Sequence, residues 1–152
     1  MSEAMSSPKV QRLTRVDFRI FRHIPTRWMD NDVFGHVNNV VYYSWFDTAV
    51  NTWLIENGLL SIATSEIAGL VVETRCTYFE SVAFPETVDA AIAVERLGRS
   101  SVTYRVGIFR QGSDDAAAQG LFTHVYVDRK TQRPVAIPAA ARDAMAMIRI
   151  SS

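Results

Sequence analysis

The sequence predicts an α+β fold in which a single antiparallel sheet curls around one buried helix. Residues 40–56 are apolar around most of their helical circumference, which is typical of a helix inside a core. After residue 70, four segments alternate at the period of a strand and are separated by short turn-prone stretches, which indicates an antiparallel meander. A chain of 152 residues forms one domain on the usual size scale. The sheet and the helix therefore bury their apolar surfaces against each other, with the sheet wrapped around the helix.

The first forty residues predict a tail, a strand and a loop. Residues 1–15 are mostly polar and predict a flexible N-terminal tail, which leaves residues 16–152 as the single folded domain. Residues 16–28 mix β-branched and aromatic side chains with arginines and predict the first strand. Residues 30–39 are rich in Asp, Asn and Gly and predict a loop.

The helix predicted over residues 40–56 has signals at both ends. Asn38 or Asn39 can cap its start, and Gly58 suits a left-handed stop after its last turn. Polar residues recur at spacings of three and four and form one narrow stripe along it: Ser44, Asp47, Thr48, Asn51 and Thr52.

The second half of the chain predicts the rest of a sheet of five to six strands. The four predicted strands span residues 72–78, 88–95, 102–108 and 121–128. Turns are predicted at residues 98–101 and 111–115, and a short helix follows Pro138. In the last strand, one alternating row is more apolar than the other: Leu121, Thr123, Val125 and Val127 alternate with His124, Tyr126 and Asp128.

Charge and composition argue against several classes of partner. Sixteen basic residues balance sixteen acidic ones, so we expect no nucleic-acid partner. No apolar run approaches eighteen residues and no signal peptide is visible, so we expect no membrane insertion and a cytoplasmic location. The single cysteine, Cys76, has no partner for an internal disulfide and is interpreted as a small core residue. The three histidines have no zinc-type spacing, so no metal is expected.

Functional residue types concentrate between Arg27 and Tyr42, where the chain passes from strand to buried helix. The first turn of a helix presents unpaired backbone N–H groups and a partial positive charge. A carboxylate a few residues upstream therefore lies next to donors that suit a developing oxyanion. This combination is the minimum needed to hydrolyse an activated acyl group.

The same segment resembles the hotdog-fold acyl-CoA thioesterases of the 4-hydroxybenzoyl-CoA thioesterase-like family. The resemblance rests on Arg27-Trp28, on the Asp-x-Asp of Asp30 and Asp32, and on Gly-His-Val-Asn-Asn at residues 35–39 followed by Tyr42. Residues 97–102 and 127–138 support it, and it extends over residues 16–147. It implies a hotdog fold and hydrolysis of an acyl-CoA thioester to a free acid and coenzyme A, with coenzyme A as part of the substrate and no cofactor.

The resemblance also implies roles for single residues. Asp32 is the expected catalytic carboxylate, which either attacks the thioester carbonyl or activates a water molecule, and backbone amides near Asn39 hold the carbonyl oxygen. The alternative without a catalytic role is that Asp32 is an ordinary turn residue. The expected substrate-binding residues are Gly35, His36, Asn38, Asn39, Tyr42, Arg99, Ser100 and Ser101.

Several assignments within this site stay open on sequence alone. Asp30 is interpreted as a structural acceptor or a surface charge, and Asp47 is a second candidate for the catalytic carboxylate. His36 is expected to orient the loop through a hydrogen bond to a carboxylate. Residues 99–101 are either a solvated hairpin or a contact for coenzyme A phosphates, with four alternative cations for that contact: Arg96, Arg129, Lys130 and Arg133.

The exposed edges of the predicted sheet lead to an expectation for the assembly of the protein. A lone curled sheet has two exposed edges, and the resemblance implies dimers joined edge to edge with active sites at the interface, so we expect at least a homodimer and consider a homotetramer as the alternative. Two rival functions remain: a hotdog hydratase or dehydratase, and a protein that binds acyl-CoA without cleaving it. The acyl group itself is not predicted.

Overall fold

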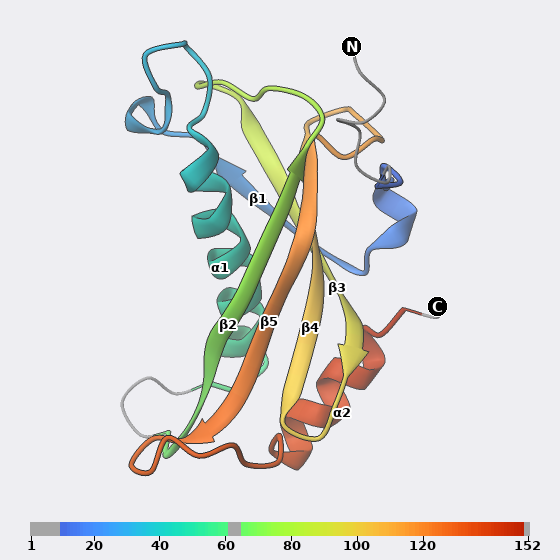
Figure 1. Cartoon of the computed structure of the whole chain (residues 1–152). Coiled ribbons are helices and arrows are strands. Elements are labelled where there is room, and N and C mark those ends of the chain that lie inside the picture. Colours follow the sequence, from blue (N-terminus) through green and yellow to red (C-terminus); the bar gives the residue numbers. More distant parts are fainter. Residues whose placement is uncertain (1–9, 61–64, 151–152) are drawn as a thin grey trace, which may run out of the picture.

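The protein folds as a five-stranded antiparallel sheet that curves along one side of a long helix (Figure 1). The computed structural model describes residues 10–60 and 65–150. The spatial order of the strands is β1-β3-β4-β5-β2, so β1 and β2 form the two edges. The elements are β1 (Ile20–Pro25), α1 (Asn39–Glu56), β2 (Ile67–Tyr78), β3 (Thr87–Leu97), β4 (Ser101–Arg110), β5 (Ala118–Asp128) and α2 (Ala139–Met147). This is the predicted hotdog arrangement, with five strands.

The sheet has two ends that matter for the site. At the helix-start end, uppermost in Figure 1, α1 begins, β1 and β2 finish, and β3 and β5 begin, because Pro25 pairs with Thr87 and Tyr78 pairs with Ala118. At the opposite end, called the far end below, α1 finishes and β2 begins next to the end of β5, where Ile67 pairs with Asp128.

The core lies between α1 and the sheet. Trp45, Phe46, Val50 and Trp53 project from α1 into one large cluster with the inner faces of the strands. A second, smaller cluster of Phe18, Ala91, Phe109 and Ala116 covers part of the opposite face. Residues 88–94 of β3 are buried on both faces of the sheet. The weak alternation of apolar and polar residues in this segment therefore does not mark one buried and one exposed face.

The ends of α1 follow the sequence signals closely. The Asn38 side chain accepts a hydrogen bond from the Val40 amide at 3.0 Å, so Asn38 is the cap and the helix begins at Asn39. Gly58 has a φ of +68°, a conformation that other residues adopt only with strain, and it follows the last turn as predicted.

Three strands differ in detail from the expectation. The first is shorter than predicted, because short 3₁₀ turns at Arg15–Asp17 and Trp28–Asp30 flank β1. β2 begins five residues before the predicted strand and contains an irregularity between Val71 and Glu73. In β5 the buried row facing α1 is Phe122, His124 and Tyr126, which includes two of the residues in the more polar row of the sequence.

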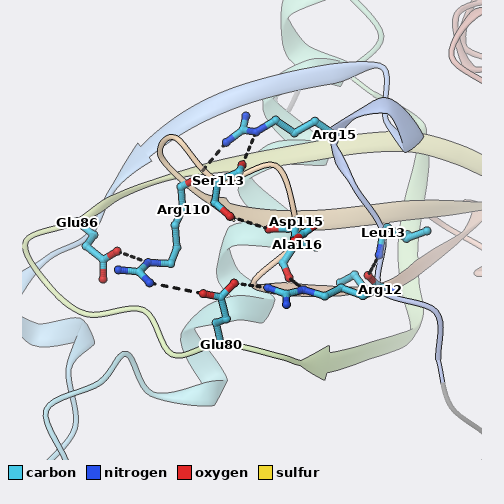
Figure 2. Close-up of polar contacts among 10 residues, drawn as sticks. Arg12, Leu13, Arg15, Glu80, Glu86, Arg110, Ser113, Asp115 and Ala116 are labelled. Carbon is cyan, nitrogen blue, oxygen red and sulfur yellow. Dashed lines mark hydrogen bonds and ion pairs between the residues drawn. The ribbon is translucent and has the colours of Figure 1, made fainter.

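The described part of the predicted tail, residues 10–15, contacts the sheet. The Leu13 amide donates to the Gln119 side chain at 2.7 Å, and Arg12 Nε donates to the Ala116 carbonyl at 2.8 Å. Arg12 also pairs with Glu80, as Figure 2 shows. Glu80 Oε1 in turn lies 3.6 Å from Arg110 Nη1. These contacts attach residues 12 and 13 to β5 and to the loop after β2, while residues 1–9 lie outside the described residues.

Within residues 10–60 and 65–150, no helix combines the length and the apolar character that crossing a lipid bilayer requires.

Candidate active site

The loop that carries Asp32 is a tight turn fastened across its base. The Asp32 amide donates to the His36 carbonyl at 2.9 Å, and the Gly35 amide donates back to the Asp32 carbonyl at 3.1 Å. Gly35 has a φ of +83°, which explains why glycine is needed there. The Asp32 carboxylate is half-buried and accepts one hydrogen bond, from the Phe34 amide at 2.9 Å. It keeps unused lone pairs, as a base or nucleophile requires.

Asp30 has a different environment, although it lies only two residues away. Its side chain is 1% exposed and accepts hydrogen bonds from the Arg27 backbone amide and from Arg27 Nε and Nη2, at 2.8–3.0 Å. The Asp30 carbonyl accepts from the Asn38 amide at 2.8 Å. Asp30 therefore anchors the loop to the start of α1, which confirms its structural interpretation.

The first turn of α1 leaves one backbone amide available. The amides of Asn38, Val40 and Val41 donate to the Asp30 carbonyl, the Asn38 side chain and the Asn38 carbonyl, respectively. Among the residues that the structure describes, the Asn39 amide has no hydrogen-bond partner. A free N–H at the positive end of an 18-residue helix has the polarity that a developing oxyanion requires. The resemblance implies an oxyanion site near this residue.

A hollow of about 290 Å³ lies beside this amide. Its walls combine the loop and the start of α1 with the end of β2 and the residues that follow it: His36, Val37, Asn39, Tyr42, Tyr78, Phe79, Glu80 and Ser81. Asp32 is not among these lining residues. The Tyr78 hydroxyl donates to the Asn39 carbonyl at 3.1 Å, which holds the end of β2 against the start of α1. Burial raises the pKa of Tyr42 to about 12, so its hydroxyl keeps its proton at neutral pH.

The sequence interpretation missed the contribution of residues 78–81 to this hollow. They come from a strand end about forty residues further along the chain, and only the packing of β2 beside α1 brings them there. An alternation of apolar and polar residues in β2 predicts a strand but carries no information on which helix end it meets.

Within this single chain, the structure does not bring all the predicted site residues together. Gly35, His36, Asn38, Asn39 and Tyr42 lie at the helix-start end with Asp32, whereas residues 99–101 form the turn between β3 and β4 at the far end. There the Ser100 carbonyl accepts from the Tyr126 amide at 2.7 Å and the Arg99 carbonyl from the Ile137 amide at 2.9 Å. The length of β3, roughly 35 Å at about 3.3 Å per residue, separates the two groups.

Two of the four alternative cations also lie far from Asp32. Arg129 and Lys130 line a cavity of about 470 Å³ with Glu66 and Asp128, again at the far end. Backbone amides of Thr131 and Lys130 donate to the Asp128 carboxylate and lower its pKa.

Three further candidates have contacts that define their roles. The His36 side chain makes no hydrogen bond with a described carboxylate; its carbonyl holds Asp32 instead, so the expected His–carboxylate bond is wrong. Asp47 accepts a hydrogen bond at 2.9 Å from Asn51, one turn along α1. Burial raises the pKa of Cys76 to about 11, which disfavours the reactive thiolate at neutral pH and fits the interpretation of Cys76 as a structural residue.

Across residues 10–60 and 65–150, no group of three or more His, Cys, Asp or Glu side chains is placed to hold a metal ion.

Comparison with known proteins places this fold and loop in a family. The PA5185 protein of Pseudomonas aeruginosa strain PAO1 is 51% identical, with a TM-score of 0.90 over 93% of this chain and 99% of that one. A DHNA-CoA thioesterase from Staphylococcus aureus, 22% identical, superposes with a TM-score of 0.74 over 84% of this chain and 91% of that one, which shows the fold alone. YsmA of Bacillus subtilis strain 168 is 24% identical over 89 residues, which span 59% of this chain and 60% of that protein.

A model of the thioesterase-like superfamily matches residues 26–145, a span that begins just before the Asp30 and Asp32 loop and ends within α2. Because this match takes in the whole candidate site and most of the sheet, the chain belongs to the thioesterase-like superfamily.

Proposed function

We propose that the protein hydrolyses an acyl-CoA thioester to a free carboxylic acid and coenzyme A, with Asp32 as the catalytic carboxylate. The observation that carries the proposal is the pairing of two features at one loop. Considering residues 10–60 and 65–150, a carboxylate with a single hydrogen bond lies on a turn that is fastened to the start of α1, and the amide of Asn39 at that start has no partner. Membership of the thioesterase-like superfamily supports the reaction class.

The chemistry needs both groups. Either an Asp32 oxygen attacks the thioester carbonyl carbon and gives an acyl anhydride that water then cleaves, or Asp32 takes a proton from the water that attacks. In both routes the carbonyl oxygen becomes an oxyanion that the Asn39 amide can hold, the carbon–sulfur bond breaks, and the thiolate takes up a proton. A positioned base typically contributes about 10²–10⁴-fold, and one oxyanion donor about 3–4 kcal/mol.

We also propose that the active assembly is a homodimer joined along β2. Three apolar residues on this edge strand, Leu70, Val71 and Val72, are 40–59% exposed. The Asp32 loop adds a second exposed apolar group, made up of Trp28, Met29, Val33 and Phe34, each at least 74% exposed. Exposed apolar side chains beside an unpaired strand edge favour pairing with a second copy. A homotetramer would require a further interface.

The proposed homodimer changes which of the predicted site residues lie at the same end of the sheet. Antiparallel pairing of two β2 strands about a two-fold axis places the helix-start end of one protomer beside the far end of its partner. Residues 99–101 of one chain then lie at the same end of the joined sheet as Asp32 of the other, where Arg99 is available for coenzyme A phosphates. The cytoplasmic location stays a prediction from the sequence.

The reaction class is tested with the full-length chain and a panel of short, medium and aromatic acyl-CoA substrates. Free thiol and free acid are quantified together, and hydration of an enoyl-CoA is followed by its absorbance. The proposal predicts equimolar thiol and acid from at least one saturated or aromatic acyl-CoA, and no hydration. Hydration without thiol release would identify a hydratase. Tight acyl-CoA binding without either product would identify a binding protein.

A further inference from the structure

Glu80 places a carboxylate on the wall of the hollow that adjoins the candidate oxyanion site. It follows the end of β2 and lines the hollow of about 290 Å³ beside the Asn39 amide. Its side chain is 35% exposed, so water screens the charge only in part. During hydrolysis the carbonyl oxygen of a thioester gains negative charge, and a second negative charge close by opposes that gain. The proposed reaction therefore requires that the charge of Glu80 be neutralised.

The segment between β2 and β3, which carries Glu80, also supports the loop of the proposed catalytic carboxylate. The Val37 amide donates to the Val82 carbonyl at 2.7 Å. The Phe84 amide donates to the Asn31 side chain at 3.1 Å. These two bonds hold the loop on either side of its carboxylate, so the loop and the segment form one bonded unit and Glu80 stays close to the site.

Two arginines from distant parts of the sequence pair with Glu80 (Figure 2). Arg12 pairs with Glu80 Oε2, and Arg110 Nη1, on β4, lies 3.6 Å from Glu80 Oε1. Arg12 Nε also donates to the Ala116 carbonyl at 2.8 Å, and the guanidinium lies over the Phe79 ring, 5.4 Å from its centroid. These further contacts fix the Arg12 guanidinium, and each oxygen of the Glu80 carboxylate faces a cation.

The charge balance of this cluster depends on Arg12. Arg110 Nε donates to Glu86 at 2.6 Å, a shorter contact than the one to Glu80, and this bond raises the pKa of Arg110. The positive charge of Arg110 is therefore largely matched by Glu86. With Arg12 present, two cations face two carboxylates and the cluster is neutral. Without the charge of Arg12, one negative charge is left over, and it falls mainly on Glu80.

The backbone around Arg12 is attached to the sheet by bonds that do not involve its charge. The Leu13 carbonyl accepts from the Ala116 amide at 2.9 Å, and the Leu13 amide donates to the Gln119 side chain at 2.7 Å. The Gln119 side chain also donates to the Gln11 carbonyl at 2.8 Å. Because Gln119 is buried, these bonds are shielded from water. A substitution that removes only the charge of Arg12 should therefore leave this stretch of chain in place.

We propose that Arg12 is a positioning residue for the hydrolysis: it pairs with Glu80 and keeps the charge of that carboxylate from opposing the oxyanion that develops at the Asn39 amide. The inference rests on the proposed function. Arg12 itself is not among the residues that line the hollow, so it acts through Glu80. Part of the N-terminal stretch that the sequence predicts as a flexible tail thereby contributes to the reaction.

The test compares kcat and KM of Arg12→Gln and of the double variant Arg12→Gln/Glu80→Gln with those of the wild type. Thiol release is measured on the best acyl-CoA substrate, well below the melting temperature of each protein. The opposing charge acts on an oxyanion that develops only during the reaction, so Arg12→Gln should lower kcat by about tenfold and change KM by less than about twofold. The double variant has no negative charge at position 80 and should recover most of the lost kcat. It also lacks the ion pair, so a purely structural role of that pair predicts no recovery.

Two further variants separate charge from stability. Arg12→Lys keeps the positive charge and should recover most of the kcat that Arg12→Gln loses. Arg22→Gln is the matched control, because it breaks a partly exposed ion pair with Glu56 at the last residue of α1, at the far end. It should leave kcat unchanged even if it lowers the melting temperature as much as Arg12→Gln does.

The outcomes distinguish this inference from the proposed function. If the wild type releases thiol and Arg12→Gln keeps the wild-type kcat, the inference is wrong and the hydrolysis stands. The same conclusion follows if the double variant is no more active than Arg12→Gln. A wild type that releases no thiol from any acyl-CoA contradicts the proposed function, and the role of Arg12 falls with it.

Discussion

Two aspartates two residues apart have opposite roles in this loop, and burial distinguishes them. Asp30 is enclosed and accepts three hydrogen bonds from Arg27, whereas Asp32 is half-buried and accepts one. The Asp-x-Asp motif identified the loop, and the resemblance assigned the second aspartate. Which of the two is buried depends on the 3₁₀ turn at Trp28–Asp30, and no pattern in the sequence predicted that turn.

The role of Asp30 predicts a loss of stability. Asp30→Asn weakens the charge-assisted bonds from Arg27 and should lower the free energy of unfolding by about 2 kcal/mol. Urea unfolding of the variant and the wild type measures this difference. Asp17→Asn is a matched control in another 3₁₀ turn, where the carboxylate accepts one backbone hydrogen bond, and it should cost less. Equal losses in the two variants would contradict the anchoring role of Asp30.

His124 predicts a dependence of stability on pH. Burial lowers its pKa from 6.5 to about 4, so between these values the unfolded chain binds more protons than the folded one. Stability should therefore fall as the pH decreases from 6.5 to 4, by up to about 3 kcal/mol from this group. His124→Gln has no such group, so its unfolding free energy should decline less over the same interval. Parallel declines in the two proteins would show that His124 is not the cause.

Among the elements, the sequence is most informative about α1. The predicted start is one residue late and the predicted end agrees, because helical periodicity over seventeen residues leaves few alternatives. The strands are harder to predict from the sequence than the helix. In β5 both alternating rows contain large side chains, so the period predicts the strand but not which row is buried. This ambiguity is why the burial of His124 was not predicted.

At the start of α1, the two neighbouring residues Asn38 and Asn39 should contribute differently to the free energy of unfolding. Asn38→Ala removes the side chain that caps the Val40 amide and should lower the unfolding free energy by about 1 kcal/mol. Asn39→Ala removes an exposed side chain that caps nothing and should leave stability within about 0.5 kcal/mol of the wild type. Thermal or urea unfolding of the two variants measures the contrast. A larger loss for Asn39→Ala would mean that the cap is assigned to the wrong residue.

For the whole molecule, the sequence predicted the architecture but not the distribution of the site. One buried helix and a run of alternating segments leave few ways to bury apolar area, so the wrapped sheet follows from pattern alone. Whether residues 99–101 meet Asp32 depends instead on strand order and on a second chain, neither of which is encoded in local periodicity.

The β2 edge predicts that assembly and activity are coupled. Val72→Lys places a charge on the exposed edge strand and should shift the protein toward a monomer and lower its turnover, although Asp32 is unchanged. Light scattering coupled to size-exclusion chromatography measures the assembly, and thiol release measures turnover. Val16→Lys, at an exposed position before β1, is the control and should affect neither. A fully active monomer would contradict an active site shared between protomers.

The most direct test of the account compares turnover by Asp32→Asn and Asp47→Asn with the wild type on the best acyl-CoA substrate. Asp32→Asn keeps the size of the side chain and loses its basicity, so kcat should fall at least about 100-fold with the assembly and melting temperature unchanged. The Asp47 carboxylate accepts its hydrogen bond from Asn51 within α1, so Asp47→Asn should stay within a few-fold of the wild type. Wild-type turnover by the Asp32→Asn protein, or a loss confined to Asp47→Asn, would contradict the assignment of the catalytic carboxylate.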